Sequence, residues 1–220
     1  MPVPFEFKSK KQLRKTLRSS AVKKKYKRFF RRRLEKDELI KESVDRNTIR
    51  AFHHRSNGIQ IGPLKLFRQL AASLVERESD TWRRIKTRKE MDEFVLNQAA
   101  RLRNNWLKRT RRPGYRGYDI GIGRAAKLLN LLLKFLTLWT KLAAKERSRL
   151  IPLLEVPLDS YTLVAIRRLC PSERIPKNAS MGFVQRKAQY ISLQKAILEL
   201  CNPEFCPAHY EIAAWNASHD

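Results

Sequence analysis

The chain has 220 residues, which suits one ordinary domain with an extension and argues against a large multidomain machine. Its 48 Lys and Arg against 21 Asp and Glu give a net charge of +27, while 42% of the residues are hydrophobic, which excludes a wholly disordered basic tail. No run of about 18 uncharged apolar residues is present to span a bilayer, and charges occupy the place of a secretion signal's apolar region. Nucleic acid is the first partner class that this charge indicates.

The basic segment, residues 8–33, carries 14 Lys or Arg and no acidic residue. Its apolar residues recur at helical spacing, which predicts a basic amphipathic helix once a polyanion neutralises the charged face. We expect this self-repelling segment to stay out of the core and to grip phosphates, with a solvated tail or targeting arm as the alternative. The residues expected to contact phosphates are Lys23, Lys24, Lys25, Arg31, Arg32 and Arg33.

Acidic residues return after Leu34, and this change in composition divides the chain into a basic N-terminal arm, residues 1–45, and a body, residues 46–220. Within the body, apolar spacing predicts a helix over residues 64–78 and a second over residues 80–109. Alternating patterns typical of strands are scarce, so we predict an all-α fold.

The main break in the body falls in residues 109–123, which hold four of the seven glycines. Gly121 and Gly123 stand directly before the most apolar stretch of the chain, and Arg124 follows them. A glycine turn that runs into a helix can present free backbone N–H groups to a phosphate. We therefore expect Gly121, Gly123 and Arg124 to bind DNA, with a purely structural turn as the alternative.

A second motif, Val-Pro-Leu-Asp at residues 156–159, precedes another apolar helix. Together with Gly121-Ile122-Gly123 it resembles the helix-hairpin-helix DNA glycosylases, the superfamily of endonuclease III and 8-oxoguanine glycosylase. Their hairpin reads approximately L-P-G-V-G-x-K, and a later V-P-V-D motif supplies an essential aspartate. The resemblance covers roughly residues 115–170 and implies a helical domain that contains a helix-hairpin-helix.

The resemblance also implies an activity, in which a damaged or modified base is flipped out of the DNA and its N-glycosidic bond is cleaved. Asp159 matches the essential aspartate, whose carboxylate would stabilise the positive charge that builds on the sugar. Bifunctional members have a lysine directly after the hairpin, where this chain has Ala125, and the nearest candidate nucleophile is Lys127. The expected catalytic residues are therefore Asp159 and Lys127.

Each candidate also has a structural interpretation. Asp159 stands before an apolar helix and is a good N-cap, a role that is compatible with catalysis. Lys127, Asn130 and Lys134 share one helix face, which is either the solvent side of a core helix or the wall of a polar pocket. The leucines between them are expected only in the core: Leu129, Leu132, Leu133 and Leu136.

Aromatic and basic residues alternate just before the glycine turn, an arrangement typical of surfaces where bases stack and phosphates are neutralised. Trp106 and Arg109 stand at its beginning. The residues expected to contact DNA here are Arg111, Arg112, Tyr115, Arg116 and Tyr118. An exposed loop without a ligand is the alternative.

The three cysteines are too few for a disulfide scaffold or a four-cysteine iron–sulfur cluster, and their spacing with His209 is irregular for zinc. We therefore expect no metal, no cofactor, half-buried thiols and a reducing compartment. His53 and His54 are expected on the surface. A short helix over residues 207–215 is expected to dock Tyr210 and Trp215 on the body.

Taken together, these observations predict a monomeric DNA glycosylase-like enzyme, with or without lyase activity, that acts on double-stranded DNA and not at a membrane. It would be cytoplasmic and associated with the nucleoid, or nuclear. The first alternative is a non-catalytic helix-hairpin-helix protein that binds DNA or RNA, in which Asp159 serves only as a cap. A protein of the membrane surface, held by the basic segment on anionic lipid, is the third class.

Overall fold

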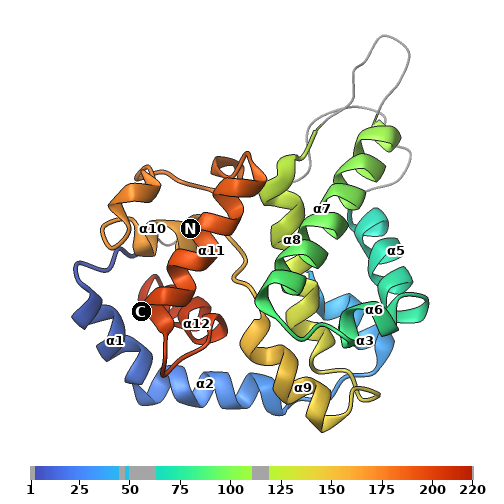
Figure 1. The fold of residues 1–220 in the computed structure, drawn as a ribbon, viewed down its shortest axis with the longest axis horizontal. Coiled ribbons are helices and arrows are strands. Elements are labelled where there is room, and N and C mark those ends of the chain that lie inside the picture. The colour runs from blue at the N-terminus through green and yellow to red at the C-terminus, as the bar shows by residue number, and fades with distance from the viewer. Residues whose placement is uncertain (1–2, 45–47, 50–62, 111–118, 220) are drawn as a thin grey trace.

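The computed structural model describes residues 3–44, 48–49, 63–110 and 119–219, and these are folded into helices joined by short connections (Figure 1). The described residues contain no strand, so the prediction of an all-α fold is confirmed. A parallel bridge joins Leu34 to Trp139. The residues that match the hairpin, Gly121-Ile122-Gly123, are described, residues 111–118 before them lie outside the described residues, and the helix-hairpin-helix stays a prediction.

The helices follow one another closely along the chain. The α-helices are α1 (Lys10–Arg18), α2 (Ser20–Arg31), α3 (Lys36–Ser43), α5 (Pro63–Glu76), α6 (Ser79–Arg83), α7 (Arg88–Thr110), α8 (Gly121–Leu136), α9 (Ala144–Leu150), α10 (Ser160–Ile166), α11 (Lys187–Cys201) and α12 (Pro207–Ala217). Three short 3₁₀ turns, η1 (Ile151–Leu153), η2 (Pro171–Glu173) and η3 (Met181–Phe183), lie between the later helices.

Helix α8 lies between two groups of helices (Figure 1). On one side it packs against α7 and α3, and α5 and α6 complete that group. On the other side, α12 lies against α1, α2, α10 and α11, so the two ends of the chain form one group. The predicted core leucines of α8 are buried: Leu129, Leu132, Leu133 and Leu136. The most apolar helix therefore supplies the centre of the core, as burial of its side chains favours.

The N-terminal basic segment is folded onto the body, and the expectation that it stays out of the core is wrong. Helices α1 and α2 bury one apolar face, with Leu13, Leu17, Val22 and Phe30 at most 8% exposed. Both helices contact α12. Burial of each such side chain contributes about 1.5–3 kcal/mol, whereas the basic side chains point to solvent, where salt screens their repulsion. The division of the chain at residue 45 stays a prediction.

The helix predicted over residues 80–109 is two helices, α6 and α7, separated by residues 84–87. The break has a local cause, because Thr87 and Glu90 form reciprocal hydrogen bonds at the start of α7. The Thr87 hydroxyl accepts from the Glu90 amide at 3.2 Å, and the Glu90 carboxylate accepts from the Thr87 amide at 3.1 Å. A Thr and a Glu three residues apart form a capping box, which begins a helix.

Candidate functional site

The glycine turn begins α8 and needs glycine at both positions, for different reasons. Gly121 has a φ of +73°, a conformation that side-chain-bearing residues rarely adopt. Gly123 has ordinary backbone angles, but a Cβ atom there would lie 2.3 Å from the carbonyl oxygen of Met181. The segment that includes Met181 therefore crosses the first turn of α8 in direct contact with its backbone.

The backbone amides of this turn are already paired within the chain, so the expectation that they are free is wrong. The Gly121 amide donates to Asp119 Oδ1 at 2.9 Å, and the Gly123 amide donates to the Val184 carbonyl at 3.2 Å. Asp119 is also bound by Arg103, and this guanidinium holds the pKa of the Asp119 carboxyl below its usual value. A carboxylate of this chain thus occupies the anion position before α8. DNA binding by Gly121 and Gly123 stays a prediction, but it has no free amide at either residue to support it.

Arg124 lies beside this turn and is half-buried. Its guanidinium donates to the Ile120 carbonyl at 3.3 Å and approaches the Gly182 backbone. One of its two terminal nitrogens is therefore committed to the turn, and its binding to DNA stays a prediction.

The two predicted catalytic residues meet in the structure. Lys127, on the second turn of α8, places its Nζ 3.1 Å from Asp159 Oδ2, and the two side chains are only 12% and 20% exposed. The other carboxylate oxygen, Oδ1, accepts the amides of Tyr161 at 3.0 Å and Thr162 at 3.1 Å. Asp159 is therefore the N-cap of α10, as predicted, and also the partner of Lys127.

Lys127 and Ala125 face different sides of α8. Ala125, where the resemblance would place a lysine, is fully buried in the core. Lys127 stands two residues later, about 200° around the helix axis, and this rotation turns it from the core toward the start of α10. In this chain the residue that reaches the aspartate is Lys127, at the position that the geometry of α8 provides.

Buried polar side chains hold the backbone that leads to Asp159. The side-chain Nδ2 of Asn130 donates to the Val156 carbonyl at 3.1 Å. The side-chain Nε2 of Gln194, on α11, donates to the same carbonyl at 2.8 Å. Gln194 also accepts the Val156 amide at 3.0 Å. Since Asn130, Gln194 and Val156 are all at most 4% exposed, these bonds fix the segment in a site without competing water. Asn130 also bonds to Tyr190, and we call Asn130, Gln194 and Tyr190 the Val156 cluster.

Tyr190 extends this cluster to a second carboxyl group. Its hydroxyl accepts from Asn130 at 2.7 Å and donates to Glu155 Oε2 at 2.7 Å. Burial raises the pKa of Glu155 well above its usual value, and a hydrogen bond with Asp92 on α7 raises it further. Glu155 Oε1 and Asp92 Oδ1 are both buried acceptors without a donor. A proton on Glu155 would satisfy both oxygens, and the raised pKa favours the neutral form of Glu155.

The face of α8 that carries Lys127, Asn130 and Lys134 is a wall of the interior. Asn130 is 2% exposed, and Lys134 pairs with Glu211 of α12 at 2.5 Å. The alternative of a solvent-facing side is therefore wrong, and of the three residues Lys134 lines a groove, whereas a polar pocket at Lys127 stays a prediction. Sequence reasoning did not find Gln194, Tyr190 or Glu155. The sequence does indicate that Glu155 is unusual, because it is the one charged residue in the apolar stretch 150–158.

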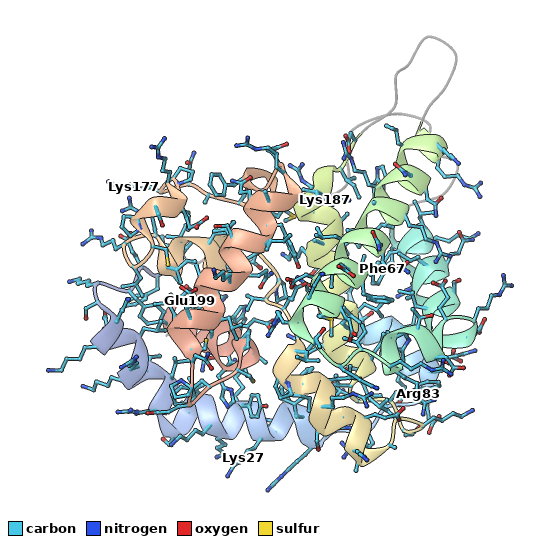
Figure 2. The ribbon with its side chains drawn as sticks, viewed as in Figure 1. Lys27, Phe67, Arg83, Lys177, Lys187 and Glu199 are labelled. Carbon is cyan, nitrogen blue, oxygen red and sulfur yellow. The ribbon has the colours of Figure 1, made fainter. Side chains whose placement is uncertain are left out.

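The basic residues of α2 and its end lie mostly on the surface. Five of the six predicted phosphate contacts are exposed, and Arg32 is half-buried: the exposed ones are Lys23, Lys24, Lys25, Arg31 and Arg33. Arg32 pairs with Glu42 at 2.5 Å, and Arg33 donates to the carbonyl of Arg32 at 2.7 Å. Figure 2 labels Lys27 at the lower edge of the molecule, on the outer side of α2. The face of α2 opposite its buried one is thus a continuous cationic surface.

Five predicted DNA contacts, Arg111, Arg112, Tyr115, Arg116 and Tyr118, lie outside the described residues, as do His53 and His54. Trp106, expected beside them, is 1% exposed, so its assignment to the nucleic-acid contact is wrong. The tail prediction holds for the helix and for Tyr210, which is fully buried, but Trp215 is 45% exposed. This difference arises because Trp215 stands on the outer side of α12, next to α2.

The cysteines are free, two buried and one half-buried, and burial raises the pKa of Cys170 to about 11 and that of Cys201 to about 12. The residues that the structure describes contain no group of three His, Cys, Asp or Glu arranged for a metal ion. Within the same residues, every helix is too short or too polar to cross a bilayer. No family model matches the chain, and neither a curated protein nor a solved structure is similar to it.

Proposed function

We propose that this protein binds nucleic acid and cleaves an N-glycosidic bond in it, as the resemblance to helix-hairpin-helix DNA glycosylases implies. One observation carries the proposal: Lys127 and Asp159, chosen from two motifs far apart in sequence, lie 3.1 Å from each other. An amine beside a carboxylate at the edge of the interior is the pair of groups that such chemistry uses. The cationic surface of α1 and α2 supplies the contact with phosphates.

Asp159 is suited to act on a sugar whose base is leaving. Its Oδ1 is held by two backbone amides at the start of α10, so the carboxylate has one orientation. A negative charge at a helix N-terminus is stabilised by the helix dipole. The fixed carboxylate would stabilise the positive charge that develops at C1′ as the bond to the base breaks, or take a proton from an attacking water.

Lys127 supplies the second possible route. Its ammonium would pass a proton to Asp159 Oδ2, and the neutral nitrogen would then attack C1′ while the base leaves with the electrons of the C1′–N bond. The attack leaves the sugar joined to Lys127, and opening of the sugar ring gives a Schiff base that borohydride reduces to a stable adduct. Hydrolysis by water activated at Asp159 gives no such adduct. The two routes therefore differ in a product that a denaturing gel separates.

The proposal is tested with DNA duplexes that carry an abasic site or one of a panel of modified bases. We expect release of a base from one of these duplexes and a loss of about 10²–10⁴-fold in rate for Asp159→Asn. Because Asn caps a helix about as well as Asp, this variant keeps the fold. A borohydride adduct that disappears in Lys127→Ala identifies the nucleophile. Base release without an adduct identifies the hydrolytic route.

A matched control is available in another partly buried ion pair. Glu146 binds Arg83 at 2.9 Å, and the two side chains are 22% and 27% exposed. The pair joins α9 to α6; Figure 2 labels Arg83 at the lower right. Glu146→Gln should therefore leave base release unchanged. Equal losses in Glu146→Gln and Asp159→Asn would show that the effect of Asp159 arises from stability alone.

The second candidate function is a non-catalytic nucleic-acid-binding module, and one observation favours it. Both carboxylate oxygens of Asp159 already have partners within the chain, one on α8 and one on α10. This is what is expected of a residue whose only role is to join the two helices. In that case no duplex in the panel releases a base. Asp159→Asn then changes the melting temperature without changing affinity for DNA.

A further inference from the structure

A groove of about 250 Å³ opens on the surface where α2, α8 and α12 meet. In Figure 1, α2 runs along the lower edge of the molecule beneath α12, and the two helices are in contact. Phe29 of α2 and Trp215 of α12 line the groove, together with Ile212. It therefore joins the cationic surface of α2 to the interior face of α8, and nothing in the proposed chemistry uses it.

The walls of the groove are suited to a flat aromatic ring. Trp215 is 45% exposed, whereas the other three tryptophans of the chain, Trp82, Trp106 and Trp139, are at most 7% exposed. One contact of the indole is with the His219 ring, stacked at 3.7 Å, and another is with Lys25 Nζ, 4.1 Å from the ring centroid. The Lys25 ammonium also donates to Asn216 Oδ1 at 2.8 Å, so a planar ligand would have to displace it from both the ring and this amide oxygen.

The polar groups of the groove indicate the chemistry of that ligand. Lys134 and Glu211 form an ion pair at 2.5 Å and are 17% and 18% exposed, so a donor and an acceptor stand side by side inside the groove. Lys25 lies on the lining beside Trp215. Two ammonium groups against one carboxylate leave the groove with a net positive charge. The ligand is therefore aromatic, able to hydrogen-bond along one edge, and attached to an anion.

We propose that this groove binds one unpaired base of a nucleic-acid strand. The base stacks on Trp215, its edge meets Lys134 and Glu211, and the Lys25 ammonium moves from the ring to the adjoining phosphate. The exposed basic residues of α2 continue the path of the strand. The inference rests on the nucleic-acid binding of the proposed function and not on base excision.

The position of Lys134 relates the groove to the Lys127–Asp159 pair. Seven residues along a helix correspond to two turns and about 10.5 Å, so the groove and the pair lie along one face of α8, with buried Asn130 between them. A single bound strand can reach both places. A base inside a duplex cannot enter the groove unless it is first unpaired, at a cost of a few kcal/mol.

Tryptophan fluorescence tests the inference directly, because only Trp215 is exposed among the four tryptophans. We expect a single-stranded oligothymidylate to quench the emission saturably and a duplex of equal length to quench it less. Trp215→Phe should abolish the change and so assign it to this residue. Stacking of one base on an aromatic side chain is worth about 1–3 kcal/mol. Trp215→Ala should therefore weaken binding of a labelled oligonucleotide by between about fivefold and about 150-fold.

Ile191 provides the matched control, since it is an exposed large apolar residue on α11, 39% exposed and away from the groove lining. Ile191→Ala should leave single-strand affinity unchanged. Equal effects of Trp215→Ala and Ile191→Ala would contradict base binding in the groove, and so would equal quenching by single strand and duplex. Either result would leave the proposed function unaffected. A protein that binds no oligonucleotide, and whose emission responds only to vesicles of anionic phospholipid, would overturn both. Base release by a protein whose oligonucleotide affinity does not change in Trp215→Ala would contradict only the binding of a base in the groove.

Discussion

Glu155 and Asp159 are carboxyl groups on the same extended segment, four residues apart, yet their surroundings are opposite in charge. Asp159 faces the ammonium of Lys127 at 3.1 Å, and a fifth of its side chain is open to solvent. Glu155 is 4% exposed and faces another carboxyl, Asp92. The first carboxyl is balanced by a cation, whereas burial and the neighbouring carboxyl raise the pKa of the second and favour its neutral form.

The contrast separates the two tasks of this segment. Glu155, buried and bonded to Tyr190, fixes the backbone, because any rearrangement would leave its polar atoms unpaired. A paired, partly open carboxylate stays accessible to a bound molecule. The Val156 cluster lies between the two and carries the rigidity of the buried end to Asp159. The same segment thus holds a buried anchor at Glu155 and a partly open carboxylate at Asp159.

The largest expected effect is a pH dependence of stability that arises from Glu155. Burial raises the pKa of Glu155 well above 4.5, with Asp92 adding to the rise while Tyr190 and Arg88 oppose it. The folded state then binds this proton more tightly than the unfolded state, so the contribution of Glu155 to the free energy of unfolding is greatest below about pH 4.5. It falls as the pH rises toward the folded-state pKa of Glu155, by about 1.4 kcal/mol for each unit of the rise in pKa. Chemical denaturation over a pH series measures it.

Glu155→Gln is the variant that isolates this effect. Glutamine keeps an acceptor for Tyr190 and supplies a permanent donor to Asp92, so the fold is preserved and the decline with rising pH disappears. Glu146→Gln is the control of opposite sign, because Arg83 lowers the pKa of Glu146 and its contribution is lost as the pH falls. An unchanged pH profile in Glu155→Gln would show that the shared proton does not exist.

The next effect concerns the cluster that joins the two carboxyl groups. Gln194→Leu removes the acceptor of the buried Val156 amide and one donor to its carbonyl. Leaving a buried polar group unpaired costs about 1–3 kcal/mol, so we expect a loss of about 2 kcal/mol in the free energy of unfolding. Gln189→Leu, on the same helix but with an exposed bond to Gln185, should change stability by less than about 0.5 kcal/mol. Equal losses in the two variants would show that the buried hydrogen bonds of Gln194 to Val156 stabilise the fold no more than an exposed hydrogen bond does.

Local rules explain which parts of this architecture were predictable from the sequence. Capping by Asp159 follows from its place before an apolar helix, and the buried leucines of α8 follow from helical periodicity. The start of α7 was equally readable, because Thr87 and Glu90 form a capping box. The prediction that residues 8–33 stay out of the core was wrong because it relied on their positive charge and not on the four apolar residues that α1 and α2 bury.

The contacts between distant elements were not predictable, because they depend on how whole helices pack. Asn130 bonds Val156 and Tyr190, which are 26 and 60 residues away, and no local pattern marks those partners. The encounter of Lys127 with Asp159 was expected only through the resemblance to a family, and the spacing of residues along the chain did not indicate it. Its geometry follows from the rotation of α8, with Ala125 buried in the core.

The smallest effect separates the two bonds that Asp159 makes. Asp159→Ala loses the cap of α10 and should lower the free energy of unfolding by about 1 kcal/mol. Asp159→Asn keeps Oδ1 as the cap and loses only the attraction to Lys127, so its loss should be smaller. Adding Lys127→Met to Asp159→Asn removes the ammonium left without its partner and should recover part of that loss. If Asn and Ala destabilise equally, the cap contributes nothing, and the position of Asp159 depends on Lys127 and the Val156 cluster alone.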